Sequence, residues 1–233
     1  MARKAPIVII DKVALETIIL SSIEAYPLET VGFLLGLRKG LDYLCKVAYP
    51  IQRAERKLKS VKFSRKIHEL MKKASEKVVG YRILGIYHSH PDELPIPSVK
   101  DIMNFMFSEY MVSLIISISK TTPSTLKWHA KENVIIGSIA GYRIILSSHV
   151  KVGSELVQAS IRSPLIDVLN LLASLGLDYS LLCERLSPED YERLQYHLNK
   201  IIYLTKRGRT YHSKKISYHR KAIKEIAKQY EIL

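Results

Sequence analysis

Residues 85–101 of the chain are Gly85-Ile-Tyr-His-Ser-His-Pro-Asp-Glu-Leu-Pro-Ile-Pro-Ser-Val-Lys-Asp101. The apolar run 83–87 predicts a buried strand. Alternate residues of a strand point to the same face about 6.6 Å apart, so His88 and His90 at the end of this strand can reach one ion. Two imidazoles and the carboxylate of Asp101 are a ligand set of catalytic zinc sites, which leave the fourth position to water.

The segment that follows the histidines predicts a loop and then a helix. Pro91, Pro95 and Pro97 favour a rigid loop. Ser98 is expected to begin the helix, with Asp101 in its first turn. A His-x-His pair alone is weak evidence for a metal, and Ser98 with Asp101 is also an ordinary helix start. The two interpretations are compatible, because a cap would hold Asp101 in the position that a ligand needs.

The order His-x-His-Pro, six residues, then Ser-x-x-Asp resembles the JAMM motif of the MPN+ (JAB) metalloproteases. That family also has a glutamate upstream, in a strand after the first helix. The segment Pro27-Leu-Glu29-Thr-Val-Gly-Phe-Leu-Leu-Gly36 fits, with Gly32 and Gly36 at the family's glycine positions. The resemblance covers roughly residues 5 to 155 and implies an α/β (α+β) fold. In that fold, which is cytidine-deaminase-like, helices flank a mixed β-sheet.

The resemblance also implies a role for each of five residues. His88, His90 and Asp101 bind one Zn²⁺ per chain, and water completes the tetrahedron. Glu29 accepts the proton of that water and passes it to the leaving amine. Ser98 donates a hydrogen bond to the developing oxyanion. The implied reaction is hydrolysis of the peptide or isopeptide bond after the C-terminal glycine of a ubiquitin-like protein, which is the expected partner.

The other polar residues of this segment carry no predicted catalytic role. Tyr87 and Ser89 face away from the histidines, so Tyr87 is predicted to lie in the core and Ser89 to support the site or bond the backbone. The remaining histidines have no ligand spacing and receive no role: His68, His129, His149, His197, His212 and His219.

Composition narrows the class of protein. The hydrophobic fraction of 47% supports a sizeable core and argues against disorder. The start of the chain lacks a long apolar segment, and the apolar stretch 134–146 contains Arg143 and is too short for a bilayer. Two cysteines, Cys45 and Cys183, give no disulfide framework. These features predict a soluble cytoplasmic protein with no membrane partner.

The formal net charge is +14, from 36 basic and 22 acidic residues. Such a balance favours polyanions or acidic protein partners. Residues 52–82 are especially basic. A composition adapted to high temperature is an alternative explanation of the same charge.

The expected elements of the first domain, 1–158, alternate between strands and helices. Strands are predicted at 7–10, 30–37, 42–50, 82–88, 111–119, 125–131 and 134–147. Helices are predicted at 12–25, 64–78 and 99–107. No internal repeat is visible.

A second domain is predicted at 162–233. Helices are expected from Ser163 to Gly176, from Ser180 to Leu186, and from Ser187 to about Ile201. Residues 202–212 are predicted to form a hairpin with its turn at Gly208, and a last basic helix is expected at 217–230. Three helices and a basic hairpin resemble a winged helix-turn-helix domain.

This domain suggests a nucleic-acid partner without establishing one. Lys206, Arg207 and Arg209 at the hairpin tip suit phosphate contacts. However, the acids at 189, 190 and 192 would oppose phosphates at the start of a recognition helix. Docking of a protein, or of a second copy as a homodimer, is the alternative use of the domain.

Three functional hypotheses remain open at this point. The first is a zinc isopeptidase for ubiquitin-like modifiers. The second is a nucleic-acid-associated regulator or repair factor in which the JAMM-like domain is a scaffold. The third keeps the zinc chemistry but acts on a sulfur-carrier adduct.

Overall fold

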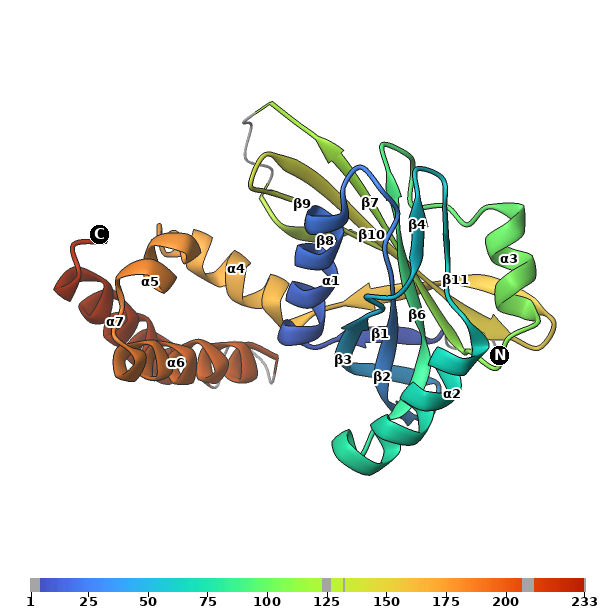
Figure 1. Ribbon diagram of the computed structural model, residues 1–233. Coiled ribbons are helices and arrows are strands. Elements are labelled where there is room, and N and C mark those ends of the chain that lie inside the picture. Colours follow the sequence, from blue (N-terminus) through green and yellow to red (C-terminus); the bar gives the residue numbers. More distant parts are fainter. Residues whose placement is uncertain (1–4, 123–126, 132, 207–211, 233) are drawn as a thin grey trace. The chain divides into compact units, whose positions relative to one another are not determined.

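The computed structural model describes residues 5–122, 127–131, 133–206 and 212–232. The chain divides into two compact units, Met1–Pro164 and Leu165–Leu233. The first unit is a mixed α+β fold, and the described part of the second consists of helices and their connections (Figure 1). No described helix is long and apolar enough to cross a membrane.

The described strands of the first unit form a nine-stranded sheet and a small two-stranded sheet. The strands are β1 (Ile7–Ile10), β2 (Val31–Lys39), β3 (Asp42–Pro50), β4 (Glu55–Lys57), β5 (Ser60–Lys62), β6 (Arg82–Pro91), β7 (Val112–Lys120), β8 (His129–Lys131), β9 (Val134–Ile139), β10 (Tyr142–Val152) and β11 (Glu155–Arg162). The large sheet has the order β11-β1-β3-β2-β6-β7-β10-β9-β8, and β11 also pairs with β10. The sheet therefore curls back on itself through β11, with β6 between β2 and β7.

Helices cover both faces of this sheet (Figure 1). Helix α1 (Lys12–Ala25) lies on the face toward which Tyr87 points, because the Tyr87 hydroxyl hydrogen-bonds Ser21 of that helix. Helix α2 (Arg65–Ala74), which continues as the π-helix η1 (Ser75–Val79), and helix α3 (Val99–Met106) lie on the other face. They share a core cluster with the alternate β2 residues Val31, Phe33 and Leu35.

Burial explains the long apolar runs of the central strands. The first six residues of β2 and the first seven of β7 are all buried. A strand that is covered on both faces reads as a nearly continuous apolar run rather than as a strict alternation, and in β7 only Ser113 and Ser117 interrupt the run. Because helices cover both faces of the sheet, polar side chains at the end of β6 are largely shielded from water.

The two sheets differ from the sequence predictions in three places. The segment predicted as one strand at 134–147 is a hairpin of β9 and β10, whose turn residues Ala140 and Gly141 have φ of 50° and 78°. Positive φ at both positions is the geometry of a tight two-residue hairpin turn. Such turns are usually recognised in a sequence by glycine or asparagine at the first position, and alanine at that position gives no such signal. The small β4–β5 hairpin and strand β11 were also not predicted.

Gly85 allows strand β6 to lie close to strand β7. A Cβ placed on it would lie 1.7 Å from the carbonyl oxygen of Val112. We therefore expect Gly85→Ala to lower the free energy of unfolding by about 3 kcal/mol or more, since the two strands must separate. Gly40→Ala, at a turn where a Cβ meets nothing within 4 Å, should cost about 1–2 kcal/mol for its positive φ. Urea unfolding of both variants measures these losses in the free energy of unfolding. A smaller loss for Gly85→Ala than for Gly40→Ala would contradict the prediction.

The described part of the second unit has four helices around one apolar core. They are α4 (Pro164–Ser174), α5 (Tyr179–Arg185), α6 (Pro188–Lys206) and α7 (Ser213–Gln229). The buried core residues are Val168, Leu172, Leu175, Leu177, Leu182, Leu194, Leu198, Ile201, Ile223 and Ala227. Helix α6 packs along α7 through this core.

The predicted hairpin at 202–212 is wrong where the structure describes it, because 202–206 belong to α6 and Ser213 begins α7. Leu194, Leu198, Ile201 and Leu204 are all buried. This stripe repeats every three or four residues, so helical packing outweighs the β-branched residues of the segment. No strand occurs among the described residues of this unit, so no wing is found in them. Residues 207–211 lie outside the described residues, and the winged-helix resemblance stays a prediction.

Candidate active site

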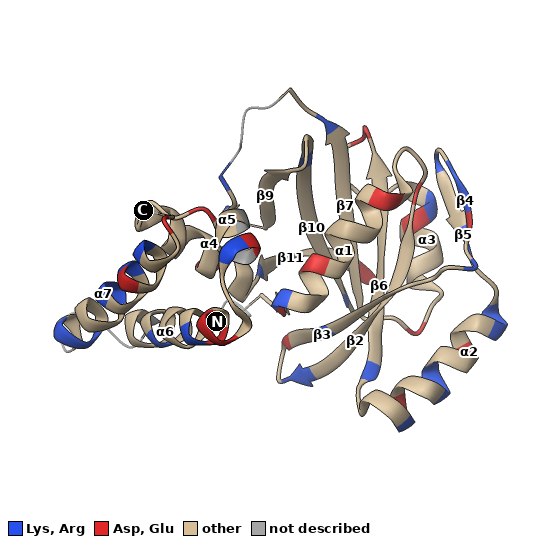
Figure 2. Cartoon of the chain, turned by 60° about the vertical axis from the view of Figure 1, so that its left-hand side comes forward, with Lys and Arg blue, Asp and Glu red and all other residues tan. Residues whose placement is uncertain are grey.

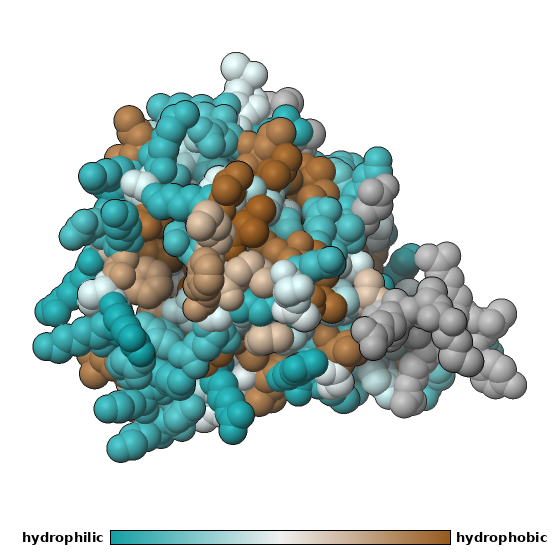
Figure 3. Space-filling model, turned by 90° about the vertical axis from the view of Figure 1, so that its right-hand side faces the viewer, coloured by the Kyte–Doolittle hydropathy of each residue, from teal (hydrophilic) through white to brown (hydrophobic). Residues whose placement is uncertain are grey.

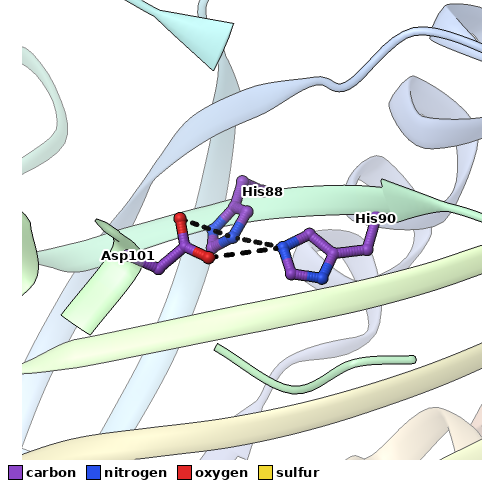
Figure 4. A group of neighbouring side chains, drawn as sticks. All are labelled: His88, His90 and Asp101. Carbon is purple, nitrogen blue, oxygen red and sulfur yellow. Dashed lines mark hydrogen bonds and ion pairs between the residues drawn. The ribbon is translucent and has the colours of Figure 1, made fainter. Parts of the chain in front are cut away.

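Strand β6 brings His88 and His90 to one side of the sheet, as the alternation of a strand requires. Both side chains are buried, with 6% and 7% of their surface exposed. Their Nε2 atoms lie 3.0 Å apart. Figure 4 shows the two rings directed toward the same point, with Asp101 opposite them.

Asp101 reaches this point from the first turn of α3. The helix begins with a capping box, in which Ser98 Oγ accepts the Asp101 N–H and the Asp101 side chain accepts the Ser98 N–H. One carboxylate oxygen lies 3.6 Å from His88 Nε2, and the other lies 3.5 Å from His90 Nε2. The ordinary helix start is therefore what holds the carboxylate against the imidazoles.

The three ligand atoms are spaced as a tetrahedral ion requires. Ligands that bind zinc at about 2.0–2.1 Å are separated by about 3.4 Å in a tetrahedron. The two Nε2 atoms lie 3.0 Å apart, and each lies 3.5–3.6 Å from a different oxygen of the Asp101 carboxylate, so all three side chains can reach one ion. His90 Nδ1 lies 3.1 Å from the Leu94 carbonyl oxygen. A carbonyl can only accept, so Nδ1 carries the hydrogen and the neutral ring presents a bare Nε2 to the centre. Among the described residues, this is the one group of three or more such side chains that could hold a metal ion.

The charges of the group support one another in the absence of a cation. Burial tends to raise the pKa of Asp101, but hydrogen bonds with His88, His90 and Ser98 outweigh it and hold that pKa well below its ordinary range. Burial tends to lower the pKa of His90, but its hydrogen bonds with Asp101 and the Leu94 carbonyl raise it. Asp101 is therefore an ionised carboxylate throughout the physiological range.

Glu29 completes the group from the end of the segment between α1 and β2. Its backbone N–H donates to the Lys57 carbonyl in the β4–β5 hairpin, at 3.0 Å. Its side chain lines a cavity of about 580 Å³ together with His88, His90, Ser98 and Asp101. The structure thus brings the five residues named from the sequence into one cavity.

The environment of Glu29 suits a carboxyl group that both accepts and returns a proton. Burial raises its pKa to about 7 in the metal-free protein, with help from the carboxylates of Asp101 and Glu93, while His90 and Lys100 act against this rise. A carboxyl group with a pKa near neutrality can both accept and return a proton.

Ser98 differs from the prediction in one detail. Its hydroxyl donates to the Asp101 carboxylate, with 2.6 Å between the oxygens. A serine hydroxyl has one hydrogen to donate. In this arrangement that hydrogen is used to hold Asp101 and does not point at a substrate oxygen.

Ser98→Ala is expected to weaken metal binding by about 10–100-fold, because Asp101 loses the group that orients it. Loss of the cap should also lower stability by about 1 kcal/mol. Ser64→Ala is the matched control, since Ser64 caps α2 in the same way and lies outside the ligand group. Calorimetric titration with zinc compares the two variants, and equal affinities would show that Ser98 is only a helix cap.

Hydrogen bonds from β7 and β10 support the loop that carries Ser98. Ser117 donates to the Glu93 carbonyl and Ser147 donates to the Pro95 carbonyl. The Lys151 ammonium donates to the carbonyls of Met106 and Ser108, at the end of α3. Sequence reasoning missed these contacts, although serines spaced along buried strands were a signal that polar groups lie on an inner face.

His149 lies on β10 between Ser147 and Lys151 and is buried, with 7% of its surface exposed. Burial, and then the charge of His88, lower its pKa to about 4. His149 is therefore neutral at pH 7 and adds no positive charge near a site built for a cation.

The other face of β6 is structural, as predicted. Tyr87 is fully buried and its hydroxyl lies 2.9 Å from Ser21 Oγ. Ser89 Oγ accepts the Thr30 N–H at 2.8 Å. These contacts tie β6 to α1 and to the residue that follows Glu29.

The predicted nucleic-acid contacts cannot be placed at a hairpin tip. Lys206 ends α6, and its side chain, Arg207 and Arg209 lie outside the described residues. The described basic residues of this unit lie mostly on α7 (Figure 2). A role in binding DNA stays a prediction without the wing on which it depended.

Comparison with known proteins gives one match in sequence. Residues 11–130, more than half of the chain, match the family model described as prokaryotic homologs of the JAB domain. No curated protein matches the chain.

Solved structures resemble the chain more distantly. A protein from Desulfitobacterium hafniense is 20% identical, with a TM-score of 0.48, over 67% of this chain and 92% of its own. A JAB1/MPN domain protein from Archaeoglobus fulgidus is 16% identical, with a TM-score of 0.35, over 65% of this chain and 94% of its own. A protein from Salinibacter ruber is 21% identical, with a TM-score of 0.43, over 66% and 90%. Assignment to a family therefore rests on the sequence match, and by that match the chain belongs to the prokaryotic homologs of the JAB domain.

Proposed function

We propose that this chain is a zinc-dependent peptidase or isopeptidase that hydrolyses the bond after the C-terminal glycine of a ubiquitin-like modifier. Membership of the JAB family supports a metal-dependent hydrolase. The observation that carries the proposal is the half-buried carboxyl group of Glu29 in the same cavity as His88, His90 and Asp101. A structural zinc site has four protein ligands and needs no such base, whereas three ligands leave one position for chemistry.

The donor set favours zinc over other common cations. Two imidazole nitrogens and one carboxylate oxygen suit zinc, whereas magnesium and calcium prefer oxygen ligands. When bound, the zinc ion lowers the pKa of a water molecule to about 7 and polarises a carbonyl group. Asp101 and the two histidines would hold it in a buried position.

Glu29 moves the proton in this proposal. It takes a proton from the attacking water and returns it to the nitrogen of the leaving amine. Without that proton the amine would leave as an anion, which is far too basic to be expelled. The raised pKa of Glu29 suits both halves of this transfer near neutral pH.

Ser98 has a positioning role toward Asp101 and a conditional role toward the substrate. Its hydroxyl can donate to the developing oxyanion only after its hydrogen bond to Asp101 is broken. While the hydroxyl holds Asp101, its one hydrogen is not available to an oxyanion, so the positioning role is the one that its present hydrogen bond supports.

An exposed apolar surface beside the site supports a protein substrate over a small adduct. Figure 3 shows hydrophobic side chains gathered on the face of the molecule that carries α3. The exposed apolar residues of the loop 92–97 between β6 and α3 (the metal loop), of α3 and of its C-cap are Leu94, Ile96, Val99, Ile102, Met103 and Phe107, between 38% and 88% exposed. Apolar side chains grouped on a surface are typical of contacts with other proteins.

The proposed function is tested by incubating zinc-loaded protein with fusions of several ubiquitin-like proteins, each joined through its C-terminal glycine to a reporter. We expect cleavage of at least one fusion after the glycine, loss of cleavage with a chelator, and recovery with zinc. Mass spectrometry of the products locates the bond. Intact fusions throughout, with zinc bound at one per chain, would contradict the proposal.

A further inference from the structure

The groove over the candidate metal centre has lysines on both of its walls. Lys59 and Lys62 stand on the β4–β5 hairpin, and Lys100 stands in the first turn of α3. All three side chains are exposed. Basic residues, in blue, are visible on both of these elements in Figure 2.

Most of the acidic side chains that line the groove belong to the candidate active site. Among the described residues that line it, the acids are Glu29, Asp101 and Glu93. The first two belong to the catalytic group, which leaves Glu93 opposite the lysines. Glu93 pairs with Lys59 at 3.0 Å, whereas Lys62 and Lys100 form no ion pair with a described residue.

We infer that the substrate segment lying in this groove carries acidic side chains next to the scissile bond. The inference rests on the proposed function, because Glu29 and the metal centre determine where that bond lies. Acidic side chains in the groove lie near Lys62 on one wall and Lys100 on the other, and the attractions, each modest because these lysines are exposed, add together. A basic side chain in the same place meets like charges, which disfavours it.

The Lys59–Glu93 pair spans the mouth of the groove, from the hairpin to the metal loop. The two side chains are 84% and 52% exposed. Exposed ion pairs are weak, so a substrate carboxylate can replace Glu93 on Lys59 at little cost. Glu93 thus occupies the place that an acidic substrate would take.

The rest of the groove does not select charge. Its lining also includes the apolar residues Val61, Phe63, Ile86 and Phe105. These residues can bury an aliphatic or aromatic side chain of any substrate. The formal net charge of +14 adds a long-range attraction for acidic partners, but discrimination near the bond falls to the three lysines.

The test is the binding of three peptides of equal length to the zinc-loaded Glu29→Gln protein. The peptides contain the same glycine bond and differ only in flanking glutamate, glutamine or lysine. We expect the glutamate peptide to bind about tenfold more tightly than the glutamine peptide and the lysine peptide to bind least. The difference should narrow as ionic strength rises. Fluorescence anisotropy gives the three affinities.

Two matched double variants test whether the lysines of the groove cause the preference for glutamate. In the same background, Lys59→Gln with Lys62→Gln should remove most of the preference for glutamate. Lys73→Gln with Lys77→Gln removes two charges outside the groove and should change affinity less than about twofold. The inference is overturned if the glutamate and lysine peptides bind equally, if no peptide binds, or if the preference survives the first pair of changes.

The same experiment separates this inference from the proposed function. Binding is measured on a protein without Glu29, so it does not depend on cleavage. Suppose that the wild-type protein shows the charge preference but cleaves none of the peptides or fusions. That result would contradict the proposed hydrolysis and would still support binding of an acidic ligand in the groove.

Discussion

Glu29→Gln is expected to bind one metal ion per chain as tightly as wild type and to cleave substrate about 10²–10⁴-fold more slowly. Glutamine fills the same space but cannot accept the proton of the attacking water. Glu29 lies beside the ligand group and is not part of it, so metal affinity should be unchanged. Turnover and zinc titration on one preparation measure the two effects together.

The matched control is Glu55→Gln, because Glu55 is an exposed carboxylate on β4 that does not line the cavity. Its rate should equal that of wild type. If Glu29→Gln keeps more than about a tenth of the wild-type rate, Glu29 is not the general base. If it loses the metal as well, Glu29 is a ligand.

Asp101→Asn is expected to lose both metal binding and activity. The change removes the one anionic ligand and leaves His88 and His90 as a two-ligand site, so affinity should fall by more than about 100-fold. Metal bound at 100 times its dissociation constant stabilises a folded protein by about 2.7 kcal/mol. The variant should therefore lack most of the metal-dependent rise in unfolding free energy that wild type shows.

Asp92→Asn is the matched control for this change. Asp92 lies in the metal loop, but its carboxylate accepts a hydrogen bond from Tyr26 and not from the histidines. Its stabilisation by zinc should match that of wild type. Equal stabilisation of Asp101→Asn and wild type would contradict the ligand assignment, whereas a metal-free protein that fails to fold would point to the capping role of Asp101.

Much of the site could be predicted because its geometry is local. The period of a strand places His88 and His90 on one face, and the helix start at Ser98 places Asp101 in the first turn. Each step needs only a few neighbouring residues. The strand β3 and helix α1 were predicted within the same bounds that the structure has, since their periodic patterns are long.

The parts that were missed depend on contacts between distant residues. The hairpin of β4 and β5 is short and charged, and its role becomes visible only where it forms one wall of the groove. His197 and His219 were given no role, yet their Nδ1 atoms lie 2.8 Å apart across α6 and α7. The hairpin at 202–212 was predicted from a turn at Gly208, whereas packing of Ile201 and Leu204 extends α6 through residue 206 instead.

Zinc anomalous scattering from crystals of the zinc-saturated protein tests the central claim most directly. The account predicts one strong peak per chain, about 2.0–2.2 Å from His88 Nε2, His90 Nε2 and an Asp101 carboxylate oxygen. No peak at that position, or a peak only between His197 and His219, would contradict it.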